Sequence, residues 1–373
     1  MRIAHVVTYV SPDGAFGGPV RVALGQVEAL TERGHDVVVY AGAPRELAGE
    51  SLHDGYRLRT YPAQRVAPGG GFATMTSPRM VRALIADAKT FDVAHIHLAR
   101  DLVTIPAAWA FRRARVPYVL QPHGMIDASS HLLSKPLDTF ATRPLLRKAS
   151  TVFTLTDREA TAITTLDTRV RTTNVVNGLR VGRGEVDTRR EDLVLFLARL
   201  APRKRPGAFV EMAERLGADF PSTRFVLAGP DEGEGATVRA AIDRSAMRHR
   251  IDWIGSVSPR ETDALLASAR VYVLPAVNEV FPMSLLESLR VGTPVVTTSS
   301  LGIADDCARY GAAVLTDGSP RELADSVARV LTDEGHAQRL TEGGFAYLRA
   351  ELDIDRVAAI LEASYEEAKG EVR

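Results

Sequence analysis

Short apolar runs alternate with stretches of helical periodicity along most of this chain. The runs are rich in Val, Ile and Leu and have the length of strands rather than of core helices. Between the first two runs, residues 19–33 carry apolar side chains at helical spacing and stop at Gly34, as a helix between two strands would. The predicted strands are residues 3–8, 36–40, 93–96, 118–121, 151–155, 193–197, 224–228, 251–254, 271–274, 294–296 and 312–315.

This alternation predicts an α/β fold in which crossover helices connect the strands of parallel sheets. There are about twice as many runs as one small doubly wound sheet needs, so we expect two such domains in tandem. The boundary is predicted within residues 178–192, which are rich in glycine and charge. We therefore expect a first domain over residues 1–180, a second over 181–355, and a C-terminal helix over 356–373 that could dock back on the first domain.

Composition restricts the partners and the compartment. The chain has 46 basic and 46 acidic side chains, so nucleic acid, which needs a basic surface, is not expected as a partner. Cys307 is the single cysteine, which excludes an intramolecular disulfide and a cysteine-rich metal cage. The first apolar run is too short for a signal peptide, and no run approaches a membrane span, so we expect a soluble cytoplasmic protein. Peripheral membrane contact is a less favoured expectation, based on the basic residues Arg112, Arg113, Arg115, Arg143, Arg147 and Lys148.

Two glutamates in the second half suggest a ligand site. Glu279 follows an apolar run in a loop, and Glu287 lies in a short predicted helix. The first turn of such a helix has backbone N–H groups without internal partners and a partial positive charge, which suits a phosphate. Pro282 is predicted at the first helical position, with donors at Met283 and Ser284. Carboxylates accept hydrogen bonds from hydroxyls, so one glutamate is interpreted as holding ribose and the other a sugar.

Both glutamates could instead be ordinary surface residues of a helix, which spacing alone does not exclude. Eight positions along a helix span about 12 Å. The two carboxylates of a glycoside hydrolase are closer, roughly 5–9.5 Å apart. The spacing therefore favours two glutamates that bind different parts of one long ligand over two that act together on a single bond.

Other predicted strand ends in the second half carry cations or glycines. Arg199 and Lys204 follow the strand at 193–197 and could neutralise a diphosphate, although a solvated basic turn has the same composition. Gly229 and Gly255 follow two further strands. The carboxyl ends of parallel strands share one edge of a sheet, which is where ligands of such sheets bind.

In the first half, Gly17 and Gly18 form a loop before a helix, and His123 follows the strand at 118–121. This loop is not a G-x-G-x-x-G fingerprint, and the second strand does not end in an acidic residue, which argues against a dinucleotide oxidoreductase. The glycines could contact a phosphate or sugar, or simply form a turn. His123 could donate to a sugar hydroxyl or have a structural role.

His95 and His97 lie two residues apart, as two metal ligands on one strand face would. No third ligand is evident near them in the sequence. We therefore expect a structural role for this pair and predict no metal site.

Taken together, these residues resemble the GT-B glycosyltransferases of family 4, which are retaining enzymes. The matching elements run through most of the chain in the order of the family: Gly17-Gly18-Pro19, His123-Gly124, Asn177-Gly178, Arg199 with Lys204, Gly229-Pro230, Gly255, Glu279 with Glu287, and Gly292-Thr-Pro-Val. The resemblance implies two Rossmann-like domains facing across a cleft, a nucleotide-sugar donor in the second domain and a hydroxyl-bearing acceptor in the first. It implies no cofactor and no obligatory metal.

The resemblance also implies roles for single residues. His123, Arg199, Lys204 and Glu279 are expected to be catalytic, with His123 near the reacting carbon and Glu279 on the donor sugar. Glu287 is expected to hold the ribose. The other expected donor-binding residues are Gly17, Gly18, Gly229, Val280, Phe281, Met283 and Ser284.

We expect sugar transfer with retention from a nucleotide-sugar, with a UDP-sugar favoured, by a front-face route in which the leaving phosphate takes the acceptor's proton. A sugar-nucleotide epimerase and a non-catalytic sugar-nucleotide-binding subunit are the alternatives. The segment after His123-Gly124 lacks the aromatic residue and proline of many relatives, and Leu179-Arg180 replaces an acidic residue. An aminocyclitol, a lipid-linked glycan and a small metabolite therefore all remain open as acceptors.

Overall fold

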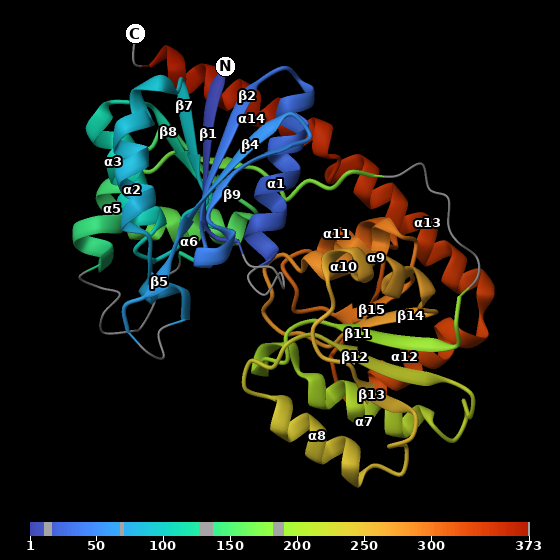
Figure 1. Cartoon of the computed structure of the whole chain (residues 1–373). Helices are drawn as coiled ribbons and strands as arrows, with labels where there is room; N and C mark the ends of the chain where they lie inside the picture. Colours follow the sequence, from blue (N-terminus) through green and yellow to red (C-terminus); the bar gives the residue numbers. More distant parts are fainter. Residues whose placement is uncertain (11–16, 68–70, 127–136, 182–189, 372–373) are drawn as a thin grey trace. The chain divides into compact units, whose positions relative to one another are not determined.

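The computed structural model describes residues 1–10, 17–67, 71–126, 137–181 and 190–371. The chain divides into unit 1, made of Met1–Arg180 and Ile354–Arg373, and unit 2, made of Val181–Asp353 (Figure 1). Each unit has one main sheet with helices on both faces, which confirms the predicted pair of Rossmann-like α/β domains. Residues 182–189, within the predicted boundary segment, lie outside the described residues.

Unit 1 contains the first ten strands. They are β1 (Arg2–Tyr9), β2 (Asp36–Ala43), β3 (Gly49–His53), β4 (Tyr56–Pro62), β5 (Gln64–Arg65), β6 (Met75–Thr76), β7 (Val93–Ile96), β8 (Tyr118–Leu120), β9 (Val152–Thr154) and β10 (Thr172–Asn174). The helices are α1 (Gly17–Glu32), η1 (Arg45–Leu47), η2 (Gly71–Thr74), α2 (Pro78–Asp87), η3 (Ala88–Thr90), α3 (Thr104–Ala114), the π-helix η4 (Asp138–Thr142), α5 (Arg143–Leu146), α6 (Asp157–Leu166) and α14 (Ile354–Gly370).

The main sheet of unit 1 has the order β10-β9-β8-β7-β1-β2-β4-β3. The strands pair in parallel except β3, which pairs antiparallel with β4. This hairpin turns at Asp54 and Gly55, both of which have a positive φ. The predicted parallel sheet therefore carries one antiparallel strand at this edge. Strand β3 was not predicted, because it is exposed and lacks the apolar run that marked the other strands.

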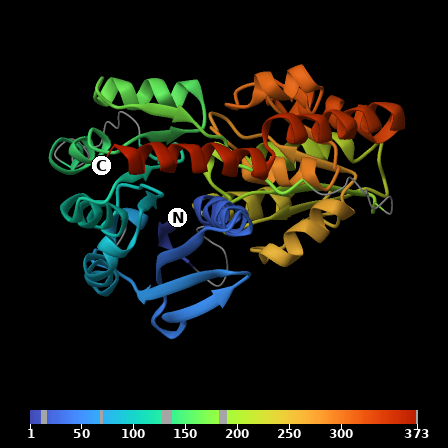
Figure 2. The ribbon, with the colours of Figure 1, turned by 90° about the horizontal axis from the view of Figure 1, so that it is seen from above.

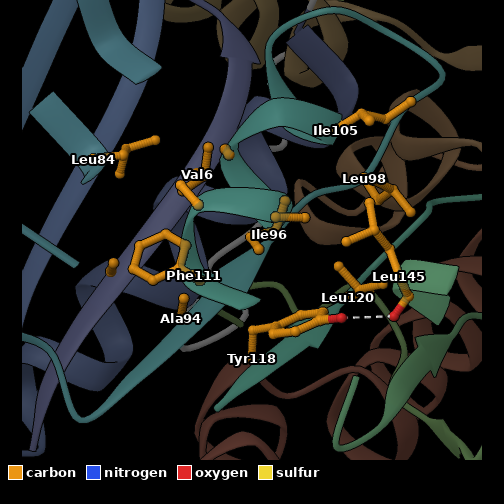
Figure 3. Close-up of a cluster of buried hydrophobic side chains, with 14 of the residues drawn as sticks. Val6, Leu84, Ala94, Ile96, Leu98, Ile105, Phe111, Tyr118, Leu120 and Leu145 are labelled. Atoms are coloured by element: carbon orange, nitrogen blue, oxygen red, sulfur yellow. Dashed lines mark hydrogen bonds between the residues drawn. The ribbon is translucent and has the colours of Figure 1, made fainter. Parts of the chain in front are cut away.

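Side chains alternate between the two faces of this sheet and build two cores. On one face, Val6, Ile96 and Leu120 pack with residues of α2 and α3 (Figure 3). There the Tyr118 hydroxyl donates a hydrogen bond to the carbonyl oxygen of Leu145 at 2.9 Å. The opposite face packs against α1 and α14, as described next.

The C-terminal helix α14 belongs to the core of unit 1. Its buried residues Val357, Leu361 and Tyr365 pack with Ile3 of β1 and Val93 of β7. In both views α14, at the red end of the colour scale, lies along unit 1 (Figures 1 and 2). The spacing of its apolar residues gives α14 an apolar face, and this face packs on the sheet of unit 1.

Unit 2 contains β11 (Leu193–Leu197), β12 (Arg224–Ala228), β13 (Ile251–Trp253), β14 (Val271–Leu274), β15 (Val295–Thr298) and β16 (Val314–Thr316). Its helices are η5 (Pro202–Lys204), α7 (Pro206–Leu216), α8 (Gly235–Arg244), α9 (Pro259–Ser268), α10 (Met283–Arg290), α11 (Ala304–Tyr310), α12 (Pro320–Thr332) and α13 (Glu334–Glu351). The sheet is parallel, with the order β13-β12-β11-β14-β15-β16.

One core of unit 2 lies under α7 and α12. It contains Phe196, Phe209, Val273 and Leu323, all fully buried. Among the helices formed by the described residues, none combines the length and the apolar character needed to cross a membrane.

Candidate functional site

The strand order of unit 2 reverses between β11 and β14. The chain proceeds from β11 outward to β12 and β13, then returns to β14 on the other side. In open α/β sheets, ligands bind beyond the carboxyl ends of the strands at such a reversal. Lys204 follows β11 in η5, and Glu279 follows β14, so the two residues come from the two strands that flank this point.

Lys204 and Glu279 form a buried ion pair. The Lys204 Nζ lies 2.9 Å from the Glu279 Oε2, and their side chains are only 8% and 12% exposed. Arg203 adds a second, more exposed cation, with its Nε 3.4 Å from the same oxygen. Burial lowers the pKa of Lys204, whereas the Glu279 carboxylate opposes that shift. The site therefore holds a cation that has lost much of its water but keeps one opposite charge beside it.

The loop that carries Glu279 is fixed through its backbone. Val277 donates its N–H to the carbonyl oxygen of Arg203 at 2.9 Å, and Gly302 donates to that of Glu279 at 2.8 Å. A Cβ at Gly302 would lie 2.4 Å from the carbonyl oxygen of Val280, so only glycine fits there. Gly302 was not predicted as a site residue, because nothing in the sequence shows which loop it supports.

Helix α10 begins at Met283, and Pro282 is its N-cap, so the prediction that Pro282 is the first helical residue was wrong by one position. Its ψ of 101° keeps it extended. The Ser284 Oγ in the first turn lies 2.7 Å from the Tyr272 hydroxyl. Glu287, one turn further, is buried.

Tyr272 lies near both predicted glutamates. It lies on β14, fully buried, and burial raises the pKa of its hydroxyl, with smaller contributions from the charges of Glu287 and Glu279. Both carboxylates are thus near this hydroxyl. Tyr272 was not predicted as a site residue, because the sequence does not distinguish a tyrosine within an apolar run from an ordinary core residue.

Arg199 lies outside the buried pair. Its Nη1 is 2.6 Å from the Glu232 Oε1, and both side chains are 37% exposed. Gly229 follows β12 with φ 143°, and a Cβ there would lie 2.0 Å from the carbonyl oxygen of Ala198. This backbone contact alone accounts for a glycine at position 229. Phe281, in the loop before α10, is buried.

In unit 1, His123 lies just beyond β8 at the carboxyl edge of the sheet. It has the left-handed φ of 53°, and Gly124 follows with φ 73°. The N–H of Gly124 donates to the Glu159 Oε1 at 2.5 Å. The His123 Nε2 lies 2.7 Å from the His97 Nδ1. Its Nδ1 is buried, and Asn177 lies near the ring. Burial lowers the pKa of His123 to about 3, and the Asn177 side chain opposes that shift.

The start of α1 leaves space beside the same edge. Gly17 is the first residue of this helix, and a Cβ at Gly18 would meet no atom of the described residues within 4 Å. A small open pocket there is lined by Val7, Thr8, Tyr9, Pro19, Val20, His97, Ala99 and Met125. Unlike Gly229 or Gly302, Gly18 is thus not required by packing against the part of the chain that the structure describes.

The expectation that His95 and His97 have no third partner was wrong. β1 pairs with β7 in a register that places His5 opposite His95. One ring nitrogen from each of His5, His95 and His97 lies within 4.8 Å of the others. Sequence alone could not reveal this neighbour, because the register of two strands separated by more than eighty residues is not encoded locally.

Two family models match the chain. "Glycosyl transferase 4-like domain" matches residues 17–178, and "Glycosyl transferases group 1" matches residues 185–346. A 2-deoxystreptamine glucosyltransferase of Streptomyces kanamyceticus is 27% identical over 76% of this chain and 79% of its own length. A D-inositol 3-phosphate glycosyltransferase of Corynebacterium urealyticum is 23% identical over 92% and 90%.

Solved structures share the fold. Anabaena HepE in complex with UDP and glucose superposes with a TM-score of 0.75 at 17% identity, covering 98% of this chain and 99% of that one. The sucrose-phosphate synthase of Thermosynechococcus elongatus has a TM-score of 0.76 at 17% identity, covering 99% of both chains.

Proposed function

The chain belongs to the glycosyl transferases of group 1, the GT-B glycosyltransferases of family 4, and on that premise we propose that it transfers a sugar from a UDP-sugar to a hydroxyl group with retention. The observation that carries the proposal is the buried Lys204–Glu279 pair beside the N-terminus of α10, at the reversal of strand order in unit 2. The relatives solved with UDP support the choice of base. Relatives named GDP-mannose-dependent make guanine the competing choice.

In this proposal the donor diphosphate lies against Lys204 and the first turn of α10. Negative charge develops on the diphosphate as its bond to the sugar breaks, and a preorganised cation and helix N-terminus stabilise that charge. Glu279 accepts hydrogen bonds from sugar hydroxyls while it pairs with Lys204, and Glu287 accepts from the ribose. Arg199 reaches the diphosphate only after leaving Glu232.

The acceptor hydroxyl attacks the sugar on the face from which the diphosphate departs. The new carbon–oxygen bond forms as the old one breaks, and the hydroxyl proton passes to the departing phosphate oxygen. Configuration is therefore retained without a covalent protein intermediate. Metal independence belongs to the same proposal, because Lys204 and the α10 amides supply the positive charge.

The test is calorimetric binding of UDP, GDP, ADP and dTDP in EDTA. We expect UDP to bind the wild-type protein, and Glu287→Ala to abolish binding. Glu214→Ala, a change at an exposed position of α7, is the matched control and should bind as the wild type does. Binding of GDP alone would replace the proposed base. Binding of none of the four, or binding unaffected by Glu287→Ala, would contradict the proposed donor site.

A further inference from the structure

Four imidazole rings and one tyrosine hydroxyl form a continuous column through unit 1, which is buried except at its half-buried end, His123. His5 of β1 and His95 of β7 are opposite each other in the sheet, and His97 lies two residues further along. These three are buried on the sheet face that α14 covers, from which Tyr365 reaches in. His123 lies at the other end, at the carboxyl edge of β8.

The members are joined by hydrogen-bond distances from end to end. The Tyr365 hydroxyl lies 2.7 Å from the His95 Nδ1 and 3.4 Å from the His5 Nε2. The His5 Nδ1 is 3.3 Å from the His97 Nε2, and the His97 Nδ1 is 2.7 Å from the His123 Nε2. His5 and His97 therefore use both ring nitrogens within the column.

The rings are neutral. Burial lowers the pKa of His5 and His123 to about 3 and that of His95 and His97 well below the usual value. A neutral imidazole donates from one nitrogen and accepts at the other. The tautomer of one ring therefore fixes the tautomer of the next. Along the column, the hydrogen bonds can all be donated in one direction or all in the other.

We propose that Tyr365 is a positioning residue that, through His5 and His97, sets which nitrogen of His123 carries the proton. A hydroxyl donor makes shorter hydrogen bonds than an N–H donor, so the Tyr365 proton is assigned to the 2.7 Å contact with His95. His5 then donates from Nε2 to the tyrosine oxygen and accepts at Nδ1. His97 donates from Nε2, and His123 donates from Nε2 to the His97 Nδ1.

The functional consequence rests on the proposed function, in which His123 lies near the reacting sugar. With Nε2 directed at His97 and Nδ1 buried near Asn177, both ring nitrogens of His123 face the protein. The column therefore fixes the His123–Gly124 turn from beneath, and the Glu159 carboxylate holds its Gly124 amide. The orientation of this turn is tied to a helix from the far end of the sequence.

The experiment is long-range ¹H–¹⁵N NMR of histidine side chains in the full-length, ligand-free protein, which distinguishes the two tautomers of each ring. The chain has nine histidines, and His123→Gln assigns the signal of interest. We expect His123 to be a single Nε2–H tautomer in the wild type and a mixture in Tyr365→Phe. An Nδ1–H tautomer in the wild type, or unchanged populations in the variant, would overturn the proposal.

Tyr118→Phe is the matched control, because it also removes a buried, hydrogen-bonded hydroxyl from unit 1 but lies outside the column. It should leave the His123 tautomer unchanged. His97→Asn is the second variant, because its amide can still reach His123 but not His5. It should give the same mixture as Tyr365→Phe, whereas a pure Nε2–H signal would contradict coupling through His97.

A metal ion held by His5, His95 and His97 is the rival explanation of the cluster, because coordinated nitrogens carry no proton. Elemental analysis of the purified protein decides between them. We expect no stoichiometric metal and identical histidine spectra before and after EDTA. One equivalent of metal per chain, with spectra that change when it is removed, would overturn the column as a proton-bearing chain.

Kinetics then test the link to turnover. Tyr365→Phe should lower kcat by roughly tenfold, because misplacement of a reacting group is costly. It should leave the KM for the donor unchanged, because unit 2 holds the donor. Since the tautomer is read without substrate, a shifted tautomer with no UDP binding would refute the proposed function and keep this inference. Normal UDP binding together with an unchanged His123 tautomer in Tyr365→Phe would refute this inference and keep the proposed function.

Discussion

Lys204 is a buried cation that is tolerated because a carboxylate lies 2.9 Å away. Bringing two charges out of water costs free energy that their attraction only partly offsets, so such a pair is weak evidence for stability. Because the pair lies at the reversal of strand order, a charge positioned in advance for a ligand explains it better than a contribution to stability does. The pair also shows why a solvated basic turn was a reasonable alternative: composition does not tell that Lys204 points inward while Arg203 stays half exposed.

Replacing Lys204 by Ala should reduce kcat by about 100-fold or more, because it removes the charge that stabilises the leaving diphosphate in the proposed function. Arg203→Ala is the matched control, since its cation lies near the same carboxylate but is 52% exposed. Its effect should be under roughly tenfold. Steady-state kinetics with a circular-dichroism check of folding measure both. An undiminished kcat in Lys204→Ala would eliminate the proposed role.

UDP binding should weaken as the pH rises and Lys204 loses its charge. Because burial lowers the pKa of Lys204, this loss should occur below pH 10.5, the usual pKa of lysine. The charged form is disfavoured in the folded state, so the contribution of Lys204 to stability rises with pH between its folded and its usual pKa. Glu279→Gln removes the charge that raises this pKa, so binding should weaken at a still lower pH. Calorimetric titration across the alkaline range tests this, and coincident pH profiles for the two proteins would contradict it.

At the scale of elements, the strand runs were predictable because buried parallel strands are continuously apolar. The β3–β4 hairpin was missed for the same reason, since an exposed edge strand has no such run. The role of His5 was missed because it depends on register. The loop that carries Glu279 is fixed by Gly302 from a different segment, and long-range support of this kind has no local signal in a sequence.

Helix α1 offers a test of whether a ligand approaches the edge of unit 1. Within the described residues, a Cβ meets no atom within 4 Å at either Gly18 or Gly25 of this helix. Glycine to alanine inside a helix is stabilising by about 0.5–1 kcal/mol. Gly25→Ala should therefore raise stability and leave kcat/KM unchanged.

Gly18→Ala should be no less stable than the wild type but should lower kcat/KM by about tenfold or more, because the methyl group occupies space that a bound substrate needs. Thermal unfolding and kinetics on both variants separate the two effects. Equal activity of the two variants would show that nothing bound comes close to Gly18.

At the scale of the whole molecule, the two units have separate cores and separate candidate residues. We expect scanning calorimetry to resolve two unfolding transitions. UDP at 100 times its Kd should stabilise unit 2 by about 2.7 kcal/mol and leave the unfolding temperature of unit 1 unchanged. Glu287→Ala should abolish the shift. A ligand-induced shift of the transition of unit 1 alone would show that the nucleotide binds there instead.

The return of α14 to unit 1 has a consequence for how the protein is made. Tyr365 contacts His5, a residue 360 positions earlier, so the ribosome must translate all of unit 2 before the first sheet receives its last covering helix. During that interval the face of β1 and β7 that α14 will bury is open to chaperones and proteases. Unit 2, whose strands are contiguous in sequence, has everything it needs before then. A nonsense mutation within codons 354–370, which encode α14, would therefore harm the half of the enzyme that was synthesised first.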